Sequence, residues 1–291
     1  MPAIREYLRP ASLSQALDMI ASAGGRAGYI AGGTFLGSAR QVPYDTLVDI
    51  TGLGLDAIEQ REDRISLGAT VTIQDLAESD IVRMPRLELL GRAARSVAGQ
   101  QIRNMATVAG DLLSGYLLAD LPAALLVLGA ELIAAQAGPD TGGDERRRIP
   151  LEEYYVSRSE RRPGDWLVTE VDFPLPPPEA RGAFIKFART EHDAAVADVA
   201  CLARVDGGRF RDVRLALSAA VNRPRRLTAA ERFLEDRPAD PESCRAAAER
   251  AMEDLTLLGN VRASRAYRAG VVPVLIRRAL LTCTGDGEGG R

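Results

Sequence analysis

Lysine, histidine and cysteine are scarce in this 291-residue chain: it has one lysine (Lys186), one histidine (His192) and three widely separated cysteines, Cys201, Cys244 and Cys283. No CxxC pair is present, so the sequence has no recognisable zinc or iron–sulfur motif. So odd and sparse a set of cysteines is typical of a reducing cytoplasm. A P-loop is excluded because no GxxxxGK[ST] motif occurs. A hydrolase triad is poorly supported because no GxSxG motif accompanies the histidine.

Strong charge and long apolar runs are also missing. The formal net charge is -3 and the sequence pI is about 5.5, which argues against a nucleic-acid partner. The first ten residues contain no apolar stretch of the secretory type. The most apolar segment, 118–132, is interrupted by Asp120, Pro122 and Glu131, so it predicts a buried helix and no membrane span. We therefore expect a cytoplasmic protein.

Length and composition predict a globular protein with two domains or two lobes, since 46% of residues are hydrophobic and 26% are charged. Ser12 and Gln15 form a capping box for a helix that Gly24 and Gly25 end. With strands at 27–30 and 46–50, this helix predicts a small strand–helix–strand lobe. Periodicity then predicts strands at 64–72, 130–136 and 165–175, helices at 72–79, 86–99 and 121–130, and loops at 101–111 and 138–150.

The proline-rich segment 174–182 predicts a domain boundary, because three consecutive prolines cannot continue a sheet or a helix. Beyond it, the pattern predicts strands at 183–190, 194–205 and 210–220, and helices at 227–236, 241–255 and 269–283. We expect the Gly-rich tail, 285–291, to be disordered.

Two adjacent glycines stand between a predicted strand and a candidate helix in the sequence AGGT, residues 31–34. Backbone N–H groups at such a turn can converge on phosphate oxygens, and the Thr34 hydroxyl can donate to them or cap the helix. A plain strand–helix turn is the simpler interpretation of an isolated pair of glycines. The sequence GLGLDA, 52–57, matches GxGxxA, but it leaves no room for the helix that a Rossmann site needs, so we expect a loop.

A second unusual stretch, 102–122, combines small residues, hydroxyls and a carboxylate. Small residues let backbone pack against a ligand, hydroxyls can donate to phosphate, and a carboxylate can accept a hydrogen bond from a sugar or ribityl hydroxyl. Taken alone, Asp120 is more simply an ordinary helix N-cap. The residues concerned are Ala106, Ala109, Gly110, Thr107, Ser114 and Asp120.

Both stretches together resemble the FAD-binding medium subunit of the molybdenum hydroxylases, the family of carbon monoxide dehydrogenase and xanthine dehydrogenase. The resemblance runs from about residue 3 to about residue 283. It rests on AGGT, on QIRNMATVAGD against the pattern QIRN-x-x-T-[IV]-G-G-[NHD], and on the aspartate before an apolar helix. The segments WLVTEVDFPLP and KFARTEHDAAVADVA, with Lys186, Arg189 and Asp193 in place, add to it.

The resemblance implies an α+β fold and a set of cofactor-binding residues. A PCMH-type FAD-binding domain, 1–176, has a small α/β lobe (about 1–55) and a larger mixed lobe (56–176) that clamp an extended FAD. A C-terminal domain, 180–284, has a three-stranded antiparallel sheet and helices. In this resemblance Asp120 binds the ribityl chain, and Leu167 and Lys186 lie near the flavin. The full set of implied FAD-binding residues is Ala31, Gly32, Gly33, Thr34, Phe35, Leu36, Thr107, Ala109, Gly110, Asp111, Ser114, Asp120, Leu167 and Lys186.

The resemblance also implies partners. A molybdopterin-containing large subunit oxidises the substrate, a small subunit with two [2Fe–2S] clusters passes electrons to the flavin, and the complex is a dimer of heterotrimers. Two alternatives stay open. Ala194 and Tyr116–Leu117 depart from the family pattern and favour a free-standing FAD-dependent oxidoreductase of a biosynthetic pathway. Ala109 and Asp111 replace the usual Gly and Asn and favour a scaffold that has lost the cofactor.

Overall fold

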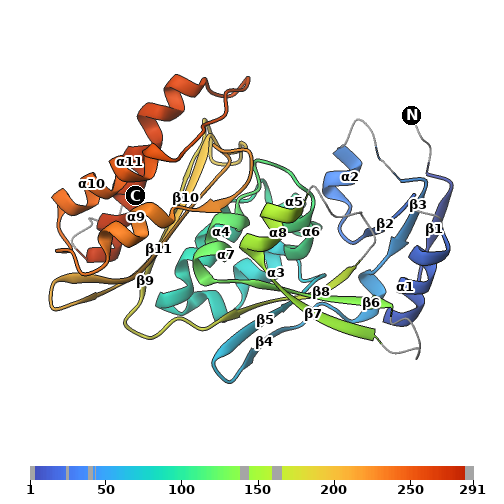
Figure 1. Cartoon of the computed structure of the whole chain (residues 1–291). Helices are drawn as coiled ribbons and strands as arrows, with labels where there is room; N and C mark the ends of the chain where they lie inside the picture. Colours follow the sequence, from blue (N-terminus) through green and yellow to red (C-terminus); the bar gives the residue numbers. More distant parts are fainter. Residues whose placement is uncertain are drawn as a thin grey trace. The chain divides into compact units, whose positions relative to one another are not determined.

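The computed structural model of the chain describes residues 4–23, 26–38, 42, 44–137, 144–158 and 166–285 (Figure 1). The chain divides into two compact units, each assembled from three segments. The first contains Met1–Asp75, Gln100–Tyr116 and Ala130–Phe173; the second contains Leu76–Gly99, Leu117–Gly129 and Pro174–Arg291. The domain boundary inferred from the proline-rich segment stays a prediction, and most of the tail expected to be disordered lies outside the described residues.

A small parallel sheet opens the first unit, in the order β1-β3-β2. Its strands are β1 (Glu6–Leu8), β2 (Ala27–Ile30) and β3 (Thr46–Asp49). The predicted helix is confirmed as α1 (Leu13–Ser22): the Ser12 side chain accepts a hydrogen bond from the backbone N–H of Gln15. The glycines expected to end it lie outside the described residues. The sequence pattern missed β1, because its three residues are mostly exposed and carry no apolar alternation.

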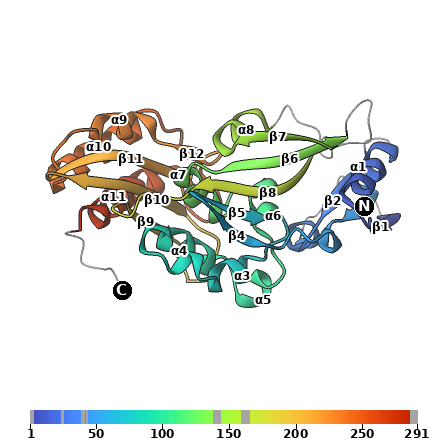
Figure 2. The ribbon, with the colours of Figure 1, turned by 90° about the horizontal axis from the view of Figure 1, so that it is seen from below.

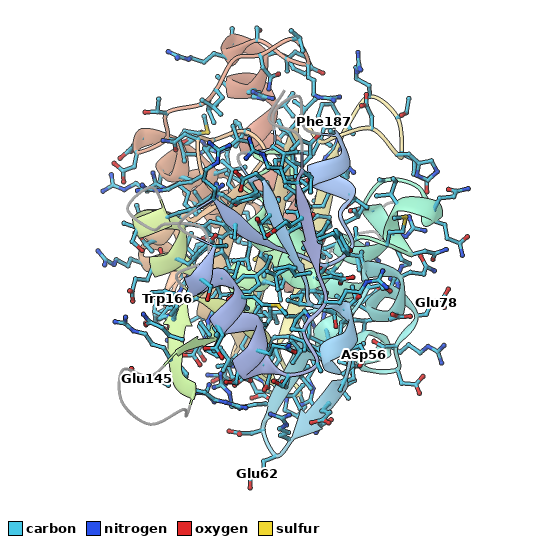
Figure 3. The ribbon with its side chains drawn as sticks, turned by 90° about the vertical axis from the view of Figure 1, so that its right-hand side faces the viewer. Asp56, Glu62, Glu78, Glu145, Trp166 and Phe187 are labelled. Carbon is cyan, nitrogen blue, oxygen red and sulfur yellow. The ribbon has the colours of Figure 1, made fainter. Side chains whose placement is uncertain are left out.

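A five-stranded sheet forms the rest of the first unit, in the order β4-β5-β8-β6-β7. Figure 2 shows β6, β7 and β8 running side by side. The strands are β4 (Ile58–Arg61), β5 (Arg64–Gly68), β6 (Glu131–Ala137), β7 (Asp144–Pro150) and β8 (Leu167–Pro174). Glu62 stands at the tip of the hairpin between β4 and β5 (Figure 3).

Strand β7 corrects the prediction of a polar loop over 138–150; residues 138–143 lie outside the described residues. Its arginines make it look like loop sequence, but β7 is an edge strand whose charges have partners on the neighbouring strands. Arg148 binds Glu131 at 3.0 Å and Asp172 at 2.7 Å, and Arg64 on β5 binds the same two carboxylates. Cross-strand charge pairs of this kind favour the extended conformation.

Short helices connect the sheet strands. They are α2 (Thr34–Ser38), α3 (Ile73–Glu78), α5 (Gln100–Arg103), α6 (Val108–Leu113) and α8 (Leu151–Ser157), with a 3₁₀ turn, η1 (Thr51–Leu53), in the GLGLDA segment. The prediction of a loop at 101–111 was therefore wrong. The segment is held by backbone bonds that the sequence does not reveal: the Ile73 N–H donates to the carbonyl of Ala106, and the Val108 N–H donates to that of Val71.

The second unit contains an antiparallel sheet in the order β12-β11-β10-β9. The three expected long strands are β9 (Arg181–Phe187), β10 (Ala197–Asp206) and β11 (Arg209–Ser218), and the two-residue β12 (Arg225–Arg226) adds a fourth. Helices α9 (Thr228–Leu234), α10 (Pro241–Glu253) and α11 (Arg265–Thr284) cover one face, and α4 (Glu88–Ser96) and α7 (Leu121–Leu128) cover the other (Figure 1).

Strand alternation decides which side chains reach each face of this sheet. Val199, Cys201, Leu215 and Leu217 belong to the buried cluster that includes α10 and α11. Asp198, the neighbour of Val199, therefore points toward the α4 and α7 side. Within the described part of the chain, no helix is both long and apolar enough to cross a membrane.

Candidate cofactor site

The AGGT turn follows β2 at the carboxyl end of the parallel sheet, where open parallel sheets commonly bind ligands. Gly33 has φ = +67°, a left-handed conformation that glycine adopts without strain. Helix α2 then begins at Thr34. Because the first N–H groups of a helix have no partner within it, this turn presents backbone donors and positive potential to its surroundings.

Gly32 packs directly against the second predicted segment. A Cβ at this position would lie 2.6 Å from the carbonyl carbon of Met105, closer still to its oxygen, and 3.2 Å from Cα of Ala106. Only glycine permits this approach of backbone to backbone. The structure therefore brings together two segments about seventy residues apart in sequence, and both belong to the first unit.

Thr107 caps helix α6. Its buried Oγ1 accepts a hydrogen bond from the Gly110 N–H at 3.1 Å, and its carbonyl accepts one from the Asp111 N–H at 2.9 Å. Ala109 lies inside α6 with helical backbone and is buried. Its methyl group therefore does not strain a left-handed turn, which removes one reason to expect that the cofactor site has been lost.

Asp111 and Ser114 lie close to two residues that the sequence did not indicate. Burial is the main cause that raises the pKa of Tyr155, and the negative charge of Asp111 raises it further, whereas the Arg158 guanidinium lowers it. Arg158 donates to the carbonyl of Ser114 at 3.5 Å. Helix α8 thus brings a positive charge to the turn that follows Asp111. No local signal could have found it, because the two segments are more than forty residues apart.

The turn at Gly115 leaves space for the Arg158 guanidinium. Gly115 has φ = +73°, and a Cβ there would overlap the Arg158 guanidinium. Beside it, Tyr116 forms a tilted ring pair with Phe35 of α2, with centroids 6.1 Å apart, and both rings are exposed.

Leu167 and Leu36 occupy different environments. Leu167, at the start of β8, is 2% exposed and packs in a buried cluster with Leu17 of α1, Val48 of β3 and Ala135 of β6. Leu36 lies in α2 and is partly exposed. Leu167 therefore supports the hydrophobic core beneath the small sheet.

Asp120 and Lys186 form a buried ion pair in the second unit. Lys186 Nζ donates to Asp120 Oδ2 at 2.9 Å and to the carbonyl of Ser96 at 2.7 Å, and the two side chains are 8% and 6% exposed. Asp120 precedes α7, but within the described residues its side chain makes no capping hydrogen bond, so it is not an ordinary N-cap. Burial raises the pKa of Asp120 to about 6, and the positive charge of Lys186 opposes part of that rise.

Asp198 joins this pair although the sequence interpretation gave it no function. It lies opposite Lys186 in the ladder between β9 and β10, is fully buried, and accepts a hydrogen bond from the Ser218 hydroxyl at 3.4 Å. Burial, followed by the charge of Asp120, raises the pKa of Asp198 well above its ordinary value. The sequence could not indicate this role of Asp198, because its position beside Lys186 depends on the register between β9 and β10.

Arg189 and Asp193, which also fit the family pattern, form an ion-pair cluster with Arg262 in the second unit. Asp193 accepts hydrogen bonds from Arg189 at 2.9 Å and from Arg262 at 2.6 Å. These guanidinium groups lower the pKa of Asp193. Among the described residues, no group of three or more His, Cys, Asp or Glu side chains could hold a metal ion.

Comparison with known proteins gives family matches along almost the whole chain. Residues 3–176 match the FAD binding domain in molybdopterin dehydrogenase, and residues 182–283 match the CO dehydrogenase flavoprotein C-terminal domain. The nicotine 6-hydroxylase medium subunit of Paenarthrobacter nicotinovorans is 30% identical over 286 residues, which cover 97% of each chain.

Two further relatives agree. The 6-hydroxypseudooxynicotine dehydrogenase complex subunit alpha of the same organism is 31% identical, covering 94% of this chain and 93% of that one. A chain of the carbon monoxide dehydrogenase from Hydrogenophaga pseudoflava has the same fold, with a TM-score of 0.90 and 26% identity, and the match covers 99% of this chain and 100% of that one. This chain therefore belongs to the family of FAD-binding flavoprotein subunits of the molybdenum hydroxylases, and FAD is its cofactor.

Proposed function

We propose that this chain relays electrons from [2Fe–2S] clusters of a partner subunit, through FAD, to an external acceptor. The observation that carries the proposal is the backbone contact between the Gly32 turn and the Met105–Ala106 segment, because it places both expected phosphate-binding segments in one unit. Membership of the flavoprotein family supplies the chemical context.

The first unit fits a diphosphate. The residues that would hold it are Ala31–Leu36 and Thr107–Ser114. The Gly32–Gly33 turn and the start of α2 offer backbone N–H groups, and the Thr34 hydroxyl can donate. Arg158 adds a cation at the Ser114 carbonyl, which offsets the charge of Asp111 near a bound anion.

The environment of Asp120 suits a ligand hydroxyl that donates a hydrogen bond to its carboxylate. Its Oδ2 accepts a hydrogen bond from Lys186, but its Oδ1 is buried and accepts none from an N–H group or a hydroxyl of the described residues. A buried acceptor without a donor is costly, and a ribityl hydroxyl of FAD would supply one. Lys186 would then act through Asp120, by fixing the orientation of its carboxylate. That Leu167 lies near the flavin stays a prediction.

FAD, when bound, accepts electrons singly and releases them singly or in pairs, so it supplies the redox chemistry. The proposed tasks of the chain are to hold the diphosphate with residues of the first unit and to orient the ribityl chain with Asp120 of the second unit. The sequence carries no cysteine motif for a cluster, so we propose that the iron–sulfur and molybdenum centres lie on partner chains.

The names of the relatives support this assembly, since they describe a medium subunit and a subunit of a dehydrogenase complex. We propose a molybdopterin-containing large subunit and a [2Fe–2S] small subunit as partners, in a dimer of heterotrimers that works in the cytoplasm. The large subunit would select the substrate.

A mixing experiment tests the relay. The full chain is loaded with FAD and mixed, without oxygen, with the chemically reduced [2Fe–2S] subunit of the proposed complex. The proposal expects the visible flavin band to bleach while the cluster absorbance reports oxidation, with one FAD per chain. FAD-free chain is the control and should leave the clusters reduced. Failure to bind FAD, or flavin reduction by a small substrate with no partner present, would overturn the proposal.

A further inference from the structure

We propose that Asp198 is a positioning residue: it carries a proton at neutral pH and donates it to Asp120, holding that carboxylate in place for a hydroxyl of the bound FAD. The proton assignment concerns the FAD-free chain as well. Only the part about the FAD hydroxyl rests on the proposed function.

The geometry is a row of polar side chains across three strands. Lys186 on β9 lies opposite Asp198 on β10, and Asp198 lies opposite Ser218 on β11. All three are therefore on one face of the sheet. Helix α7 packs on that face, and Asp120 immediately precedes this helix. The Asp120 and Asp198 side chains are within hydrogen-bonding reach of each other.

The donors and acceptors do not balance if both carboxyl groups are ionised. Lys186 donates to Oδ2 of Asp120, and Ser218 donates to Oδ2 of Asp198. Oδ1 of each aspartate is buried, and neither accepts a hydrogen bond from a donor in the described part of the chain. Asp198 is fully buried on β10, an inner strand of the sheet. One proton on Asp198 turns an acceptor into a donor and provides both groups with a partner.

The charges do not balance either. Two ionised aspartates beside one ammonium leave a net negative charge in a buried cluster, which low-dielectric surroundings strongly disfavour. One retained proton makes the cluster neutral. Of the other groups on this face, α4 contributes the carbonyl of Ser96, and the Arg214 guanidinium of β11 donates to the carbonyl of Val127. Lys186 is the cation whose charge lowers the pKa of both aspartates, and Arg214 is not among the causes for either.

Their donors distinguish the two carboxyl groups. Asp120 accepts a hydrogen bond from the Lys186 ammonium, whereas the donor to Asp198 among the described residues is the neutral Ser218 hydroxyl. Burial raises the pKa of both groups, and the charge of Asp120 raises that of Asp198 further. The proton therefore belongs to Asp198.

The consequence is a carboxylate fixed from two sides. Lys186 holds one oxygen of Asp120, and the Asp198 proton holds the carboxylate from the sheet side. A carboxylate oxygen has two lone pairs, so Oδ1 can still accept a ligand hydroxyl. At alkaline pH, loss of the Asp198 proton replaces this hydrogen bond with a repulsion between two anions, so the affinity for FAD should fall.

Infrared spectroscopy of the FAD-free full chain tests the proton directly. The chain is prepared with ordinary and with carboxyl-labelled aspartate, and the carbonyl stretch of a protonated carboxylic acid is followed at neutral pH. We expect an isotope-sensitive band in the wild type and its absence in Asp198→Asn. A wild type without such a band, or a band unchanged by the substitution, would overturn the proposal.

The pH dependence of FAD binding tests the positioning role. We expect the dissociation constant of the wild type to rise by about tenfold or more towards alkaline pH, the equivalent of one charge-assisted hydrogen bond. Asp198→Asn keeps a permanent donor and should bind FAD with nearly constant affinity. Asp198→Ala removes the donor and should bind about tenfold more weakly throughout.

Ser218→Ala is the matched comparison: it removes the hydroxyl whose hydrogen bond lowers the pKa of Asp198, so the fall in FAD affinity should remain and move to higher pH. Equal pH profiles for the wild type and Asp198→Asn would contradict the positioning role. If the chain bound no FAD while the infrared band behaved as expected, the proposed function would fail and the proton assignment would stand.

Discussion

Replacement of Gly32 by alanine perturbs the backbone contact on which the proposed diphosphate site depends. The added Cβ would lie 2.6 Å from the Met105 carbonyl carbon, while ordinary contact begins at 3.4 Å. The two backbones must therefore separate by at least about 0.8 Å, the difference between these distances, and by more to clear the oxygen. Neither partner is a flexible side-chain end, so the separation has to move the turn or the segment before α6.

A movement of this size is large for backbone hydrogen bonds, whose useful range from donor to acceptor is about 2.7–3.2 Å. Losing one charge-assisted bond to a diphosphate costs about 1.5–3 kcal/mol, so the dissociation constant for FAD should rise by at least about tenfold. Overpacking should also lower the free energy of unfolding by about 1–3 kcal/mol.

The assay is calorimetric titration of the full chain with FAD, combined with chemical denaturation of the FAD-free chain. Gly37→Ala is the matched control: it lies in the same helix, α2, and a Cβ there meets nothing within 4 Å. It should keep FAD affinity and change stability by less than about 1 kcal/mol. If Gly32→Ala and Gly37→Ala had the same affinity for FAD, the close approach would have no part in cofactor binding.

Three further substitutions give separate outcomes. Thr107→Ala and Thr72→Ala each remove the capping hydroxyl of a short helix, so each should destabilise by about 0.5–2 kcal/mol, but only Thr107→Ala should weaken FAD binding in titrations. Lys186→Met leaves a buried carboxylate without its cation and should cost about 3–5 kcal/mol in urea unfolding; a loss below 1 kcal/mol would contradict the buried pair. Asp198→Asn tests how the free energy of unfolding depends on pH. Burial raises the pKa of Asp198 in the folded chain above its ordinary 3.8, so the wild type should lose stability relative to the variant as pH rises above about 4. A difference in stability that does not depend on pH would refute this prediction.

Local chemistry explains what the sequence could predict. The Ser12 cap and the Gly32–Gly33 turn each depend on residues three or fewer positions apart, and the structure contains both. The long strands of the second unit were readable because apolar residues alternate along them. The family was predicted from the resemblance of AGGT, QIRNMATVAGD and the aspartate before an apolar helix to the family pattern, in their order along the chain.

Long-range pairing explains what the sequence could not predict. The stretch at 101–111 forms two short helices because its backbone bonds to residues 71–73, and β7 is a strand because its arginines meet carboxylates on β6 and β8. Asp198 becomes significant only through its register opposite Lys186, and Arg158 only through its contact with Ser114. Each of these depends on tertiary context, which no periodicity encodes.

A crystal structure of the full chain with bound FAD tests the central claim most directly. The account predicts that the diphosphate oxygens accept hydrogen bonds from backbone N–H groups of both the Gly32–Thr34 turn and the segment around Thr107–Gly110. A diphosphate that contacts only one of these segments, or neither, would contradict it.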